Sequence, residues 1–352
     1  MRREDFGTDQ RGNSVELFTL QNKNGTQAKI STLGAALVSF ARKDKTGVLR
    51  DVVLGYDKAE DYLSDGSRGY YFGATVGRNA NRIANAVITI DGREYALEAN
   101  SGSNNLHSGS CGVSHRIWEA DCLDDEKNRV ALKCFSADLE QGFPGNMTMK
   151  VSYTLTEDDA LHIEYEAVSD KDTVANFTNH SYFNLGGHDS GDIGNQKLKI
   201  YAKAFTPLTK DTSIPTGEIR PVKGTPLDFT EFKEIGKEIA QDYEQLIYAR
   251  GYDHNFLLDN DGKTALAAEA ACEETGIHLY AYTDCPGVQL YTANFVEEHK
   301  GKGGAVYGER HGFCLESQYV PDACHNPQFQ TPFLKAGETY RSETVYKLGL
   351  DG

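Results

Sequence analysis

Apolar and polar residues alternate along much of this chain with the period of two that is typical of half-buried β-strands. From Met147 to Leu155, every odd position is apolar or aromatic and every even position is polar. After the turn-forming acids at 157–159, the same alternation runs from Leu161 to Ala167. The two runs therefore predict a β-hairpin.

The dipeptides Asn24-Gly25 and Asp91-Gly92 predict two further hairpins, because both suit a type I′ turn. They join Val15–Leu20 to Ala28–Ile30 and Val87–Ile90 to Arg93–Leu97, respectively. The remaining strand candidates, separated by Gly, Asn and Asp, are Leu198–Phe205, Ile277–Tyr282, Val288–Phe295 and Thr339–Leu348.

One segment has the pattern of a helix. Asp228-Phe229-Thr230-Glu231 has the spacing of a capping box, and Phe232, Ile235 and Ile239 follow at intervals of three and four. Everywhere else strand patterns follow one another without a long linker, an internal repeat or a low-complexity run. The fold class is therefore all-β, a large antiparallel β-sandwich with few short helices rather than a series of βαβ units.

Composition and length agree with a single globular domain. Of the 352 residues, 39% are hydrophobic and 25% are charged, and no apolar run approaches the roughly 20 residues that span a bilayer. We expect residues 1–12 to be a polar tail and residues 13–352 to form one domain.

Charge narrows the range of partners. The 36 Lys and Arg against 52 Asp and Glu give a net charge of −16, which repels nucleic acid and anionic membranes. The N-terminal residues contain no apolar signal segment, so we expect a cytoplasmic location. Seven cysteines without a Cys-x-x-Cys pair fit neither a disulfide framework nor a zinc site, so we expect reduced and mostly buried thiols.

The segment Ala175–Leu185 has an unusual polar face. If it forms a strand, its polar face carries Asn176, Thr178, His180, Tyr182 and Asn184. Such a mixture suits the floor of a polar ligand groove, and the alternative is a solvated sheet face. Gln289, Tyr291 and Phe295 repeat the mixture after Pro286-Gly287, where the alternative is an ordinary edge strand.

Glu316 is an acid within an apolar strand segment. Burial there raises the pKa of a carboxyl above about 4.3 and makes the carboxylate a better base, whereas an outward-facing Glu316 is simply solvated. Cys314 nearby is either a nucleophile or, more commonly for such a cysteine, inert packing.

Three other polar residues are candidate ligand contacts. The segment Gly77–Arg82 lacks the spacing of a glycine-rich phosphate loop, which excludes nucleotide binding, but Asn81 and Arg82 can donate to hydroxyl groups. His107 lies in turn-rich sequence. Two histidines and Glu316 also make three possible zinc ligands, but no His-x-x-x-His pair supports a metal site, so we expect none.

Six short motifs occur in order between residues 77 and 322. They are Gly77-Arg78-Asn79-Ala80-Asn81-Arg82-Ile83, Asn105-Leu106-His107, Asn179-His180-Ser181-Tyr182-Phe183-Asn184-Leu185, Tyr252-Asp253-His254-Asn255-Phe256, Pro286-Gly287-Val288-Gln289, and Gly312-Phe313-Cys314-Leu315-Glu316-Ser317-Gln318 with Pro321-Asp322. In this combination the chain resembles the aldose 1-epimerase family, the galactose mutarotases. Asn79, Ser108 and Ala293 depart from the family pattern, and these departures concern substrate preference more than activity.

The resemblance implies a β-supersandwich with a groove for a free aldohexose such as galactose or glucose, and an isomerase that interconverts α and β anomers without a cofactor. It implies Glu316 as general base, His180 as general acid and His107 as a second donor near the ring oxygen. The implied sugar ligands are Asn81, Arg82, Asp253 and Gln289, and Tyr182 suits the apolar face of the sugar. We expect no nucleic-acid or membrane partner, and a monomer or small homo-oligomer.

Three alternatives stay open at this point. A relative acting on a hexose 6-phosphate requires an added cationic group, for which Arg78 and Arg82 are candidates. A glycoside hydrolase would use Asp253 and Glu316 as its carboxylate pair. A carbohydrate-binding module would keep the groove without turnover, but this leaves the presence of both His180 and Glu316 unexplained.

Overall fold

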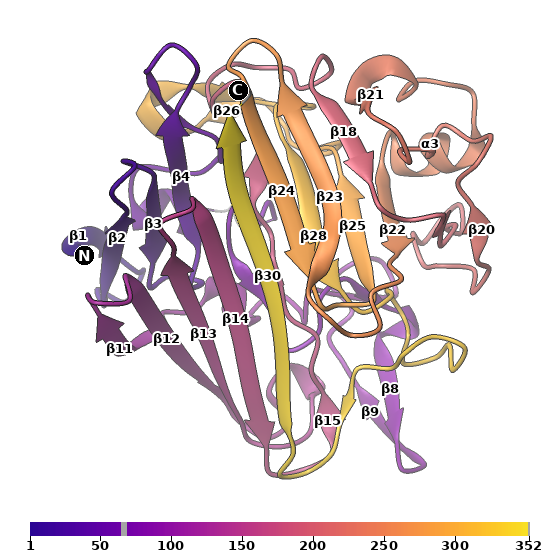
Figure 1. Ribbon diagram of the computed structural model, residues 1–352. Helices are drawn as coiled ribbons and strands as arrows, with labels where there is room; N and C mark the ends of the chain where they lie inside the picture. Colours follow the sequence, from indigo (N-terminus) through magenta and orange to yellow (C-terminus); the bar gives the residue numbers. More distant parts are fainter. Residues whose placement is uncertain (65–68, 351–352) are drawn as a thin grey trace.

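The segments with the most regular alternation form a nine-stranded antiparallel sheet, which faces the viewer in Figure 1. In this computed structural model, which describes residues 1–64 and 69–350, Met147 lies opposite Ser169 and Leu155 lies opposite Leu161. The predicted hairpin is therefore confirmed. In spatial order the sheet contains β11 (Glu119–Asp124), β12 (Arg129–Ser136), β13 (Met147–Leu155), β14 (Ala160–Ser169), β30 (Thr339–Leu350), β24 (Ile277–Thr283), β23 (Ala265–Cys272), β18 (Lys197–Ile200) and β21 (Lys233–Glu234).

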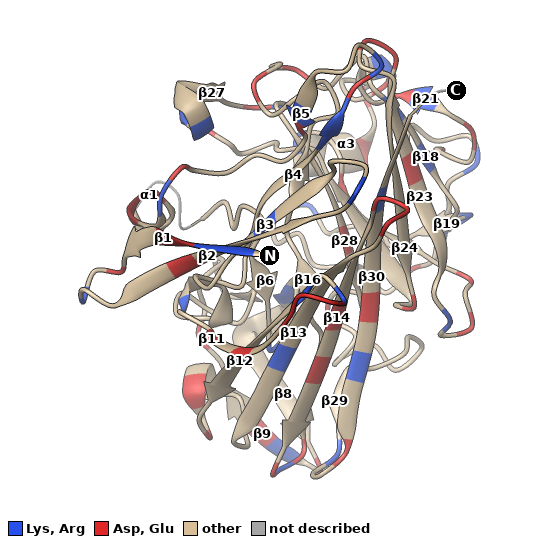
Figure 2. Cartoon of the chain, turned by 60° about the vertical axis from the view of Figure 1, so that its left-hand side comes forward, with Lys and Arg blue, Asp and Glu red and all other residues tan. Residues whose placement is uncertain are grey.

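The outer face of this sheet is charged and its inner face is apolar. Figure 2 shows acidic and basic residues along β13, β14 and β30. Arg341 on β30 and Glu166 on β14 form an ion pair at 2.7 Å on the exposed face. Tyr346, on the inner face of β30, is buried. The polar positions of the alternating pattern thus face solvent and the apolar positions face the core, as expected for half-buried strands.

A six-stranded sheet lies behind the first one in Figure 1 and carries Glu316, Asp253, Gln289 and Tyr182. The phenol of Tyr346 on β30 crosses the core and donates a hydrogen bond of 2.8 Å to the carbonyl oxygen of Leu315 on β28. Buried side chains from both sheets form one continuous apolar cluster. In spatial order the second sheet contains β17 (Tyr182–Phe183), β28 (Phe313–Gln318), β25 (Gly287–Tyr291), β22 (Asp253–Leu257), β19 (Ala204–Phe205) and β20 (Arg220–Pro221).

The N-terminal residues are part of the fold rather than a tail. Residues Arg2–Thr8 form β1, which pairs with β2, and Phe6 is buried in an apolar cluster. The expected boundary at residue 13 is therefore wrong, because a short polar strand completes its hydrogen bonds at the edge of a sheet. This five-stranded sheet contains β1, β2 (Ser14–Gln21), β3 (Gln27–Ser31), β4 (Leu37–Lys43) and β5 (Leu49–Asp51).

Short elements connect the three sheets. The two-stranded pairs are β6 (Thr75–Val76) with β16 (Thr178–Asn179), β7 (Arg82–Ile83) with β10 (Asn105–Leu106), β8 (Val87–Ile90) with β9 (Arg93–Ala96), β15 (Thr173–Val174) with β29 (Phe333–Leu334), and β26 (His299–Lys300) with β27 (Val306–Tyr307). The helical elements are α1 (Ala59–Leu63), α3 (Glu244–Ala249) and the 3₁₀ turns η1 (Ala84–Ala86), η2 (Val113–His115), η3 (Glu140–Gly142), η4 (Ile235–Lys237) and η5 (Lys302–Gly304). Among the described residues, every helix is too short or too polar to cross a bilayer.

Of the two predicted type I′ turns, one forms. Asp91 and Gly92 have φ of 50° and 77°, and Ile90 pairs with Arg93, which confirms a two-residue hairpin turn. At the other position, strand pairing already ends at Gln21 opposite Gln27, so residues 22–26 form a longer loop. The Asn22 side-chain oxygen accepts the backbone N–H groups at 24 and 26 and closes this loop.

The predicted helix at 228–239 does not form. The Asp228 carboxylate accepts both the backbone N–H, at 3.1 Å, and the hydroxyl, at 2.6 Å, of Thr230, which closes a tight turn instead of capping a helix. The chain then adds the short strand β21 to the edge of the large sheet, opposite β18. Tertiary pairing thus overrides a local helical pattern.

The other strand predictions hold with changed ends. Ile277–Tyr282 and Thr339–Leu348 form β24 and β30, each slightly longer than predicted. Residues 198–205 split into β18 and β19, which belong to different sheets. The strand predicted over 288–295 ends at Tyr291. Ala293, two residues later, has a φ of 52°, which is incompatible with a strand.

Arg78 is a buried residue whose hydrogen bonds connect the segment before β7 to the large sheet. Its guanidinium is 2% exposed and donates to the Ser136 hydroxyl and to the carbonyl oxygens of Ser136, Ala137 and Pro144, at 2.8–3.0 Å. All of its ligands are therefore protein atoms, and its role is structural.

We expect Arg78→Met to lower the free energy of unfolding by about 3 kcal/mol or more, because it leaves several buried acceptors without a donor. Urea unfolding followed by circular dichroism measures this effect. Arg341→Met removes an exposed arginine and should change stability by less than about 1 kcal/mol. Equal effects of the two substitutions would contradict this assignment.

Candidate active site

One cavity of about 150 Å³ collects most of the residues selected from the sequence. It is lined by Gly69, Tyr70, Tyr71, Asn81, Arg82, Leu106, His107, His180, Tyr182, Asp253, Tyr291, Phe295 and Glu316. A larger hollow of about 500 Å³ lies beside the N-terminal strands and shares none of these residues. Chemistry rather than size therefore identifies the site.

Glu316 lies on β28, an interior strand of the six-stranded sheet. All six residues of β28 are buried, and Glu316 lies opposite Gln289 on β25. Its side chain is 2% exposed, so the solvated alternative is wrong. Because β28 pairs on both sides, the backbone ladder fixes the direction in which the carboxylate points.

His180 lies at a break between two short strands. Residues 178–179 pair with β6, whereas residues 182–183 pair with β28 in another sheet. The expected continuous strand over 175–185 is therefore wrong. Asn176, Thr178 and Asn184 do not line the cavity, yet all three are buried, so a solvated sheet face is wrong as well.

His107 follows the end of β10 in a left-handed conformation, with a φ of 51°. The pairing of β10 with β7 places Leu106 opposite Arg82 and brings His107 to the cavity. The backbone N–H of Asn81 donates to Nδ1 of His107 at 3.2 Å. A neutral His107 therefore carries its proton on Nε2 and is a fixed hydrogen-bond donor.

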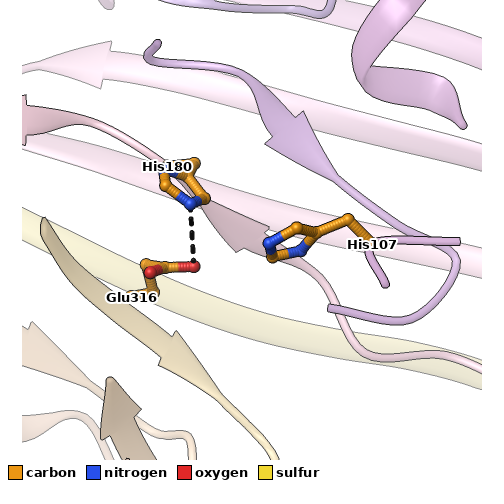
Figure 3. A group of neighbouring side chains, drawn as sticks. All are labelled: His107, His180 and Glu316. Atoms are coloured by element: carbon orange, nitrogen blue, oxygen red, sulfur yellow. Dashed lines mark ion pairs between the residues drawn. The ribbon is translucent and has the colours of Figure 1, made fainter. Parts of the chain in front are cut away.

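The three proposed catalytic side chains converge from separate elements, as Figure 3 shows. The His180 Nε2 and Glu316 Oε2 atoms are 3.6 Å apart, which is too long for a direct hydrogen bond. The rings of His107 and His180 meet edge to face with centroids 5.4 Å apart. Among the described residues, Glu316 Oε2 and Arg82 Nε have no hydrogen-bond partner although both atoms are buried. These atoms are therefore available to a polar ligand.

Burial shifts the two proposed proton carriers in opposite directions. Desolvation, with a further contribution from Asp253, raises the pKa of Glu316 well above its ordinary value. Desolvation lowers the pKa of His180 to about 4. The pKa of Glu316 shifts in the direction expected for a buried carboxyl, and the pKa of His180 falls because the ring is almost completely enclosed.

Asp253 and Gln289 act as a unit. Gln289 Nε2 donates to Asp253 Oδ1 at 2.7 Å, and Asp253 lines the cavity whereas Gln289 does not. Burial raises the pKa of Asp253, and Arg82 and this hydrogen bond oppose the shift. Gln289 lies on an interior strand, so the edge-strand alternative is wrong, and its direct contact is with Asp253.

Aromatic rings enclose the cavity more completely than the sequence indicates. Tyr182 lines it as expected, together with Tyr291 and Phe295. Tyr71 lies with its ring centroid 4.8 Å from that of His107 and 5.8 Å from that of His180. Sequence reasoning missed Tyr70 and Tyr71, because they lie in a loop without periodicity and only the fold brings them to the histidines.

The arrangement of hydrogen bonds is unfavourable for zinc. Potential ligand atoms of His107, His180 and Glu316 lie within 4.8 Å of one another. A histidine that binds a metal through one nitrogen normally donates a hydrogen bond from the other. In His107 the other nitrogen accepts one from Asn81, which leaves the proton on the nitrogen that faces the site. The group is thus better suited to hydrogen bonding and proton transfer.

Comparison with known proteins agrees with this site. The sequence profile of the family described as Aldose 1-epimerase matches residues 16–347. The chain belongs to the aldose 1-epimerase family. It is 40% identical to galactose mutarotase from Bos taurus, over 96% of this chain and 95% of that protein, and 37% identical to aldose 1-epimerase from Escherichia coli K12, over 96% of each.

Solved structures extend the agreement to the fold. An aldose epimerase homologue from C. elegans superposes with a TM-score of 0.86 at 30% identity, covering 96% of this chain and 99% of that one. Galactose 1-epimerase from Lactobacillus acidophilus superposes with a TM-score of 0.85 at 27% identity, covering 100% and 99%. The expected all-β mutarotase-like fold is confirmed, and the chain is an isomerase that interconverts the anomers of aldoses.

We expect the burial of Glu316 to make stability depend on pH. Its raised pKa means that the folded protein keeps a proton that the unfolded chain loses above about pH 4.5, so unfolding free energy falls as pH rises through this range. The Glu316→Gln variant lacks this titrating group. The free energy of unfolding of the variant minus that of the native protein should therefore increase between pH 4 and pH 8.

Urea unfolding at several pH values measures that difference. Glu166→Gln, an exposed substitution on β14, is the matched control and should show no comparable trend. A constant difference between Glu316→Gln and the native protein over this range would show that Glu316 is not desolvated.

Proposed function

We propose that this enzyme interconverts the α and β anomers of a free aldohexose such as galactose or glucose, with Glu316 and His180 as its proton-transfer pair. The observation that carries the proposal is the buried carboxylate oxygen of Glu316, which lies 3.6 Å from His180 Nε2 and has no hydrogen-bond partner in the described part of the chain. A sugar hydroxyl or ring oxygen in this gap can contact both groups.

Anomer exchange requires one proton to leave the sugar and another to enter it. Glu316 removes the proton of the C1 hydroxyl while His180 Nε2 protonates the ring oxygen. The bond between C1 and the ring oxygen breaks, and C1 becomes an aldehyde carbon. After rotation about the C1–C2 bond, His180 takes back the proton from the former ring oxygen while Glu316 returns its proton to the oxygen on C1, and the ring closes on the other face.

Desolvation makes the ion pair, from which the proposed ring opening starts, less stable than the neutral pair that follows it. Before ring opening, the reacting pair consists of a Glu316 carboxylate and a His180 imidazolium; after it, both side chains are neutral. Burial raises the pKa of Glu316 and lowers that of His180, so the site favours the neutral products of both transfers. In the free enzyme, too, the neutral pair is more stable than the ion pair. The two forms contain the same number of protons and differ only in whether Glu316 or His180 holds one of them.

His107 has a different role from His180. Its Nδ1 accepts the Asn81 backbone N–H, and burial lowers the pKa of His107 well below 6.5. His107 therefore stays neutral and presents Nε2–H to the site. We assign it to the ring oxygen, where a fixed donor stabilises charge as it develops.

The remaining polar groups are suited to sugar hydroxyls. Arg82 and Asn81 supply donors, and Asp253 supplies an acceptor whose position is fixed by Gln289. Tyr182 covers an apolar face of the ring. Of the two arginines considered for a sugar phosphate, Arg78 is fully used by protein atoms, which favours an unphosphorylated substrate.

We expect Glu316→Gln and His180→Asn each to lower kcat by about 100-fold or more, because each removes a group that transfers a proton. Polarimetry on freshly dissolved α-galactose and α-glucose, against an enzyme-free blank, measures the rate. Glu166→Gln should retain native turnover, and circular dichroism verifies that the variants fold. Near-native kcat in Glu316→Gln would rule out this mechanism.

We expect Asp253→Asn to raise KM for the sugar about 10-fold or more, because it weakens a charge-assisted hydrogen bond to substrate. Gln289→Leu should raise KM in the same direction but less, since it acts only through the position of Asp253. Initial rates over a range of sugar concentrations separate KM from kcat. A larger effect of Gln289→Leu than of Asp253→Asn would indicate that Gln289 binds the sugar itself.

A further inference from the structure

Cys314 contacts the nitrogen of His180 that faces away from the proposed reaction. Its sulfur lies 3.6 Å from His180 Nδ1, and both side chains are buried. Cys314 precedes Glu316 by two residues on β28, so the two side chains project from the same face of the strand. One strand therefore supplies a neighbour to each nitrogen of the same imidazole.

The proposed proton transfer requires a particular tautomer of His180. If Nε2 gives its proton to the ring oxygen and later takes it back, Nδ1 must keep its own proton throughout. In serine proteases an aspartate accepts this Nδ1–H and orients the ring. Here the side chain at the corresponding position is a thiol.

We propose that Cys314 is a positioning residue that accepts a hydrogen bond from His180 Nδ1–H and thereby directs the proton-transferring Nε2 toward Glu316 and the sugar. This inference rests on the proposed role of His180 as the general acid. It replaces our expectation that Cys314 serves only for packing.

The chemistry of sulfur suits this task. A neutral thiol is a weak acceptor, so it orients the ring without the strong stabilisation of an imidazolium that a carboxylate provides. His180 therefore stays able to release its Nε2 proton. Burial raises the pKa of the Cys314 thiol well above its ordinary value, which keeps it protonated and excludes the nucleophilic alternative.

The contrast with His107 supports the assignment. At His107 the Nδ1 atom faces a backbone N–H, which is a donor and places the ring proton on Nε2. At His180 the Nδ1 atom faces the sulfur of Cys314 instead. The two rings are thus held in opposite tautomers, one as a fixed donor and the other as a proton carrier.

Nitrogen-15 NMR of the imidazole groups tests this tautomer directly in the sugar-free enzyme. We expect neutral His180 to show a protonated Nδ1 and an unprotonated Nε2 in the native protein and in Cys314→Ser, since a hydroxyl also accepts. In Cys314→Ala we expect a mixture of tautomers. His180→Asn identifies the resonances.

Polarimetry provides the second readout. Loss of one hydrogen bond should lower kcat about 10-fold in Cys314→Ala, whereas Cys314→Ser should stay within about threefold of native turnover. Cys272→Ala removes another buried cysteine, on β23, and should change neither the tautomer nor kcat.

A native His180 with its proton on Nε2, or a Cys314→Ala variant with native tautomer and native kcat, would overturn the inference. The NMR result does not depend on turnover. Full activity of His180→Asn would instead refute the general-acid role, so failure of the proposed function is distinguishable from failure of the assignment of Cys314.

Discussion

Removal of water from one carboxyl group is the physical constraint on which this site depends. Glu316 lies 2% exposed in the middle of a sheet, and its nearest cationic candidate, His180, is almost as deeply buried. An isolated charge is costly in such surroundings, so the site favours neutral forms of both groups. The proposed ring opening discharges the pair, so the same cost favours its neutral product over the ion pair from which it starts.

The fold holds this unfavourable arrangement in place. β28 pairs with β17 and β25, and the Tyr346 phenol from the large sheet binds the carbonyl oxygen of Leu315 beside Glu316. Arg78 anchors the segment that carries Asn81 and Arg82. Its guanidinium donates to the carbonyl oxygen and the hydroxyl of Ser136 on β12 and to the backbone after that strand. These contacts fix the position of the site, which contains buried polar atoms without a partner among the described residues.

Two histidines at one site have different functions because their outer nitrogens have different neighbours. An Asn81 N–H faces His107, and a Cys314 sulfur faces His180. Residue type alone does not distinguish a fixed donor from a proton carrier, since both side chains are imidazoles. The hydrogen bonds around each ring assign the roles, and they also make His107 a poor metal ligand.

The sequence by itself determined the strands with regular alternation, because the direction of successive side chains is a local property of extended backbone. Its ordered motifs also led to Glu316, His180 and His107. Only tertiary structure decided that β1 joins a sheet, that the segment at 228–239 is not a helix, and that the strand at His180 is broken, since each depends on a distant pairing partner. Tertiary structure also decided the position of Tyr71, the hydrogen bond from Gln289 to Asp253 and the lowered pKa of His180. These depend on burial and on contact between segments far apart in the chain, which no local pattern encodes.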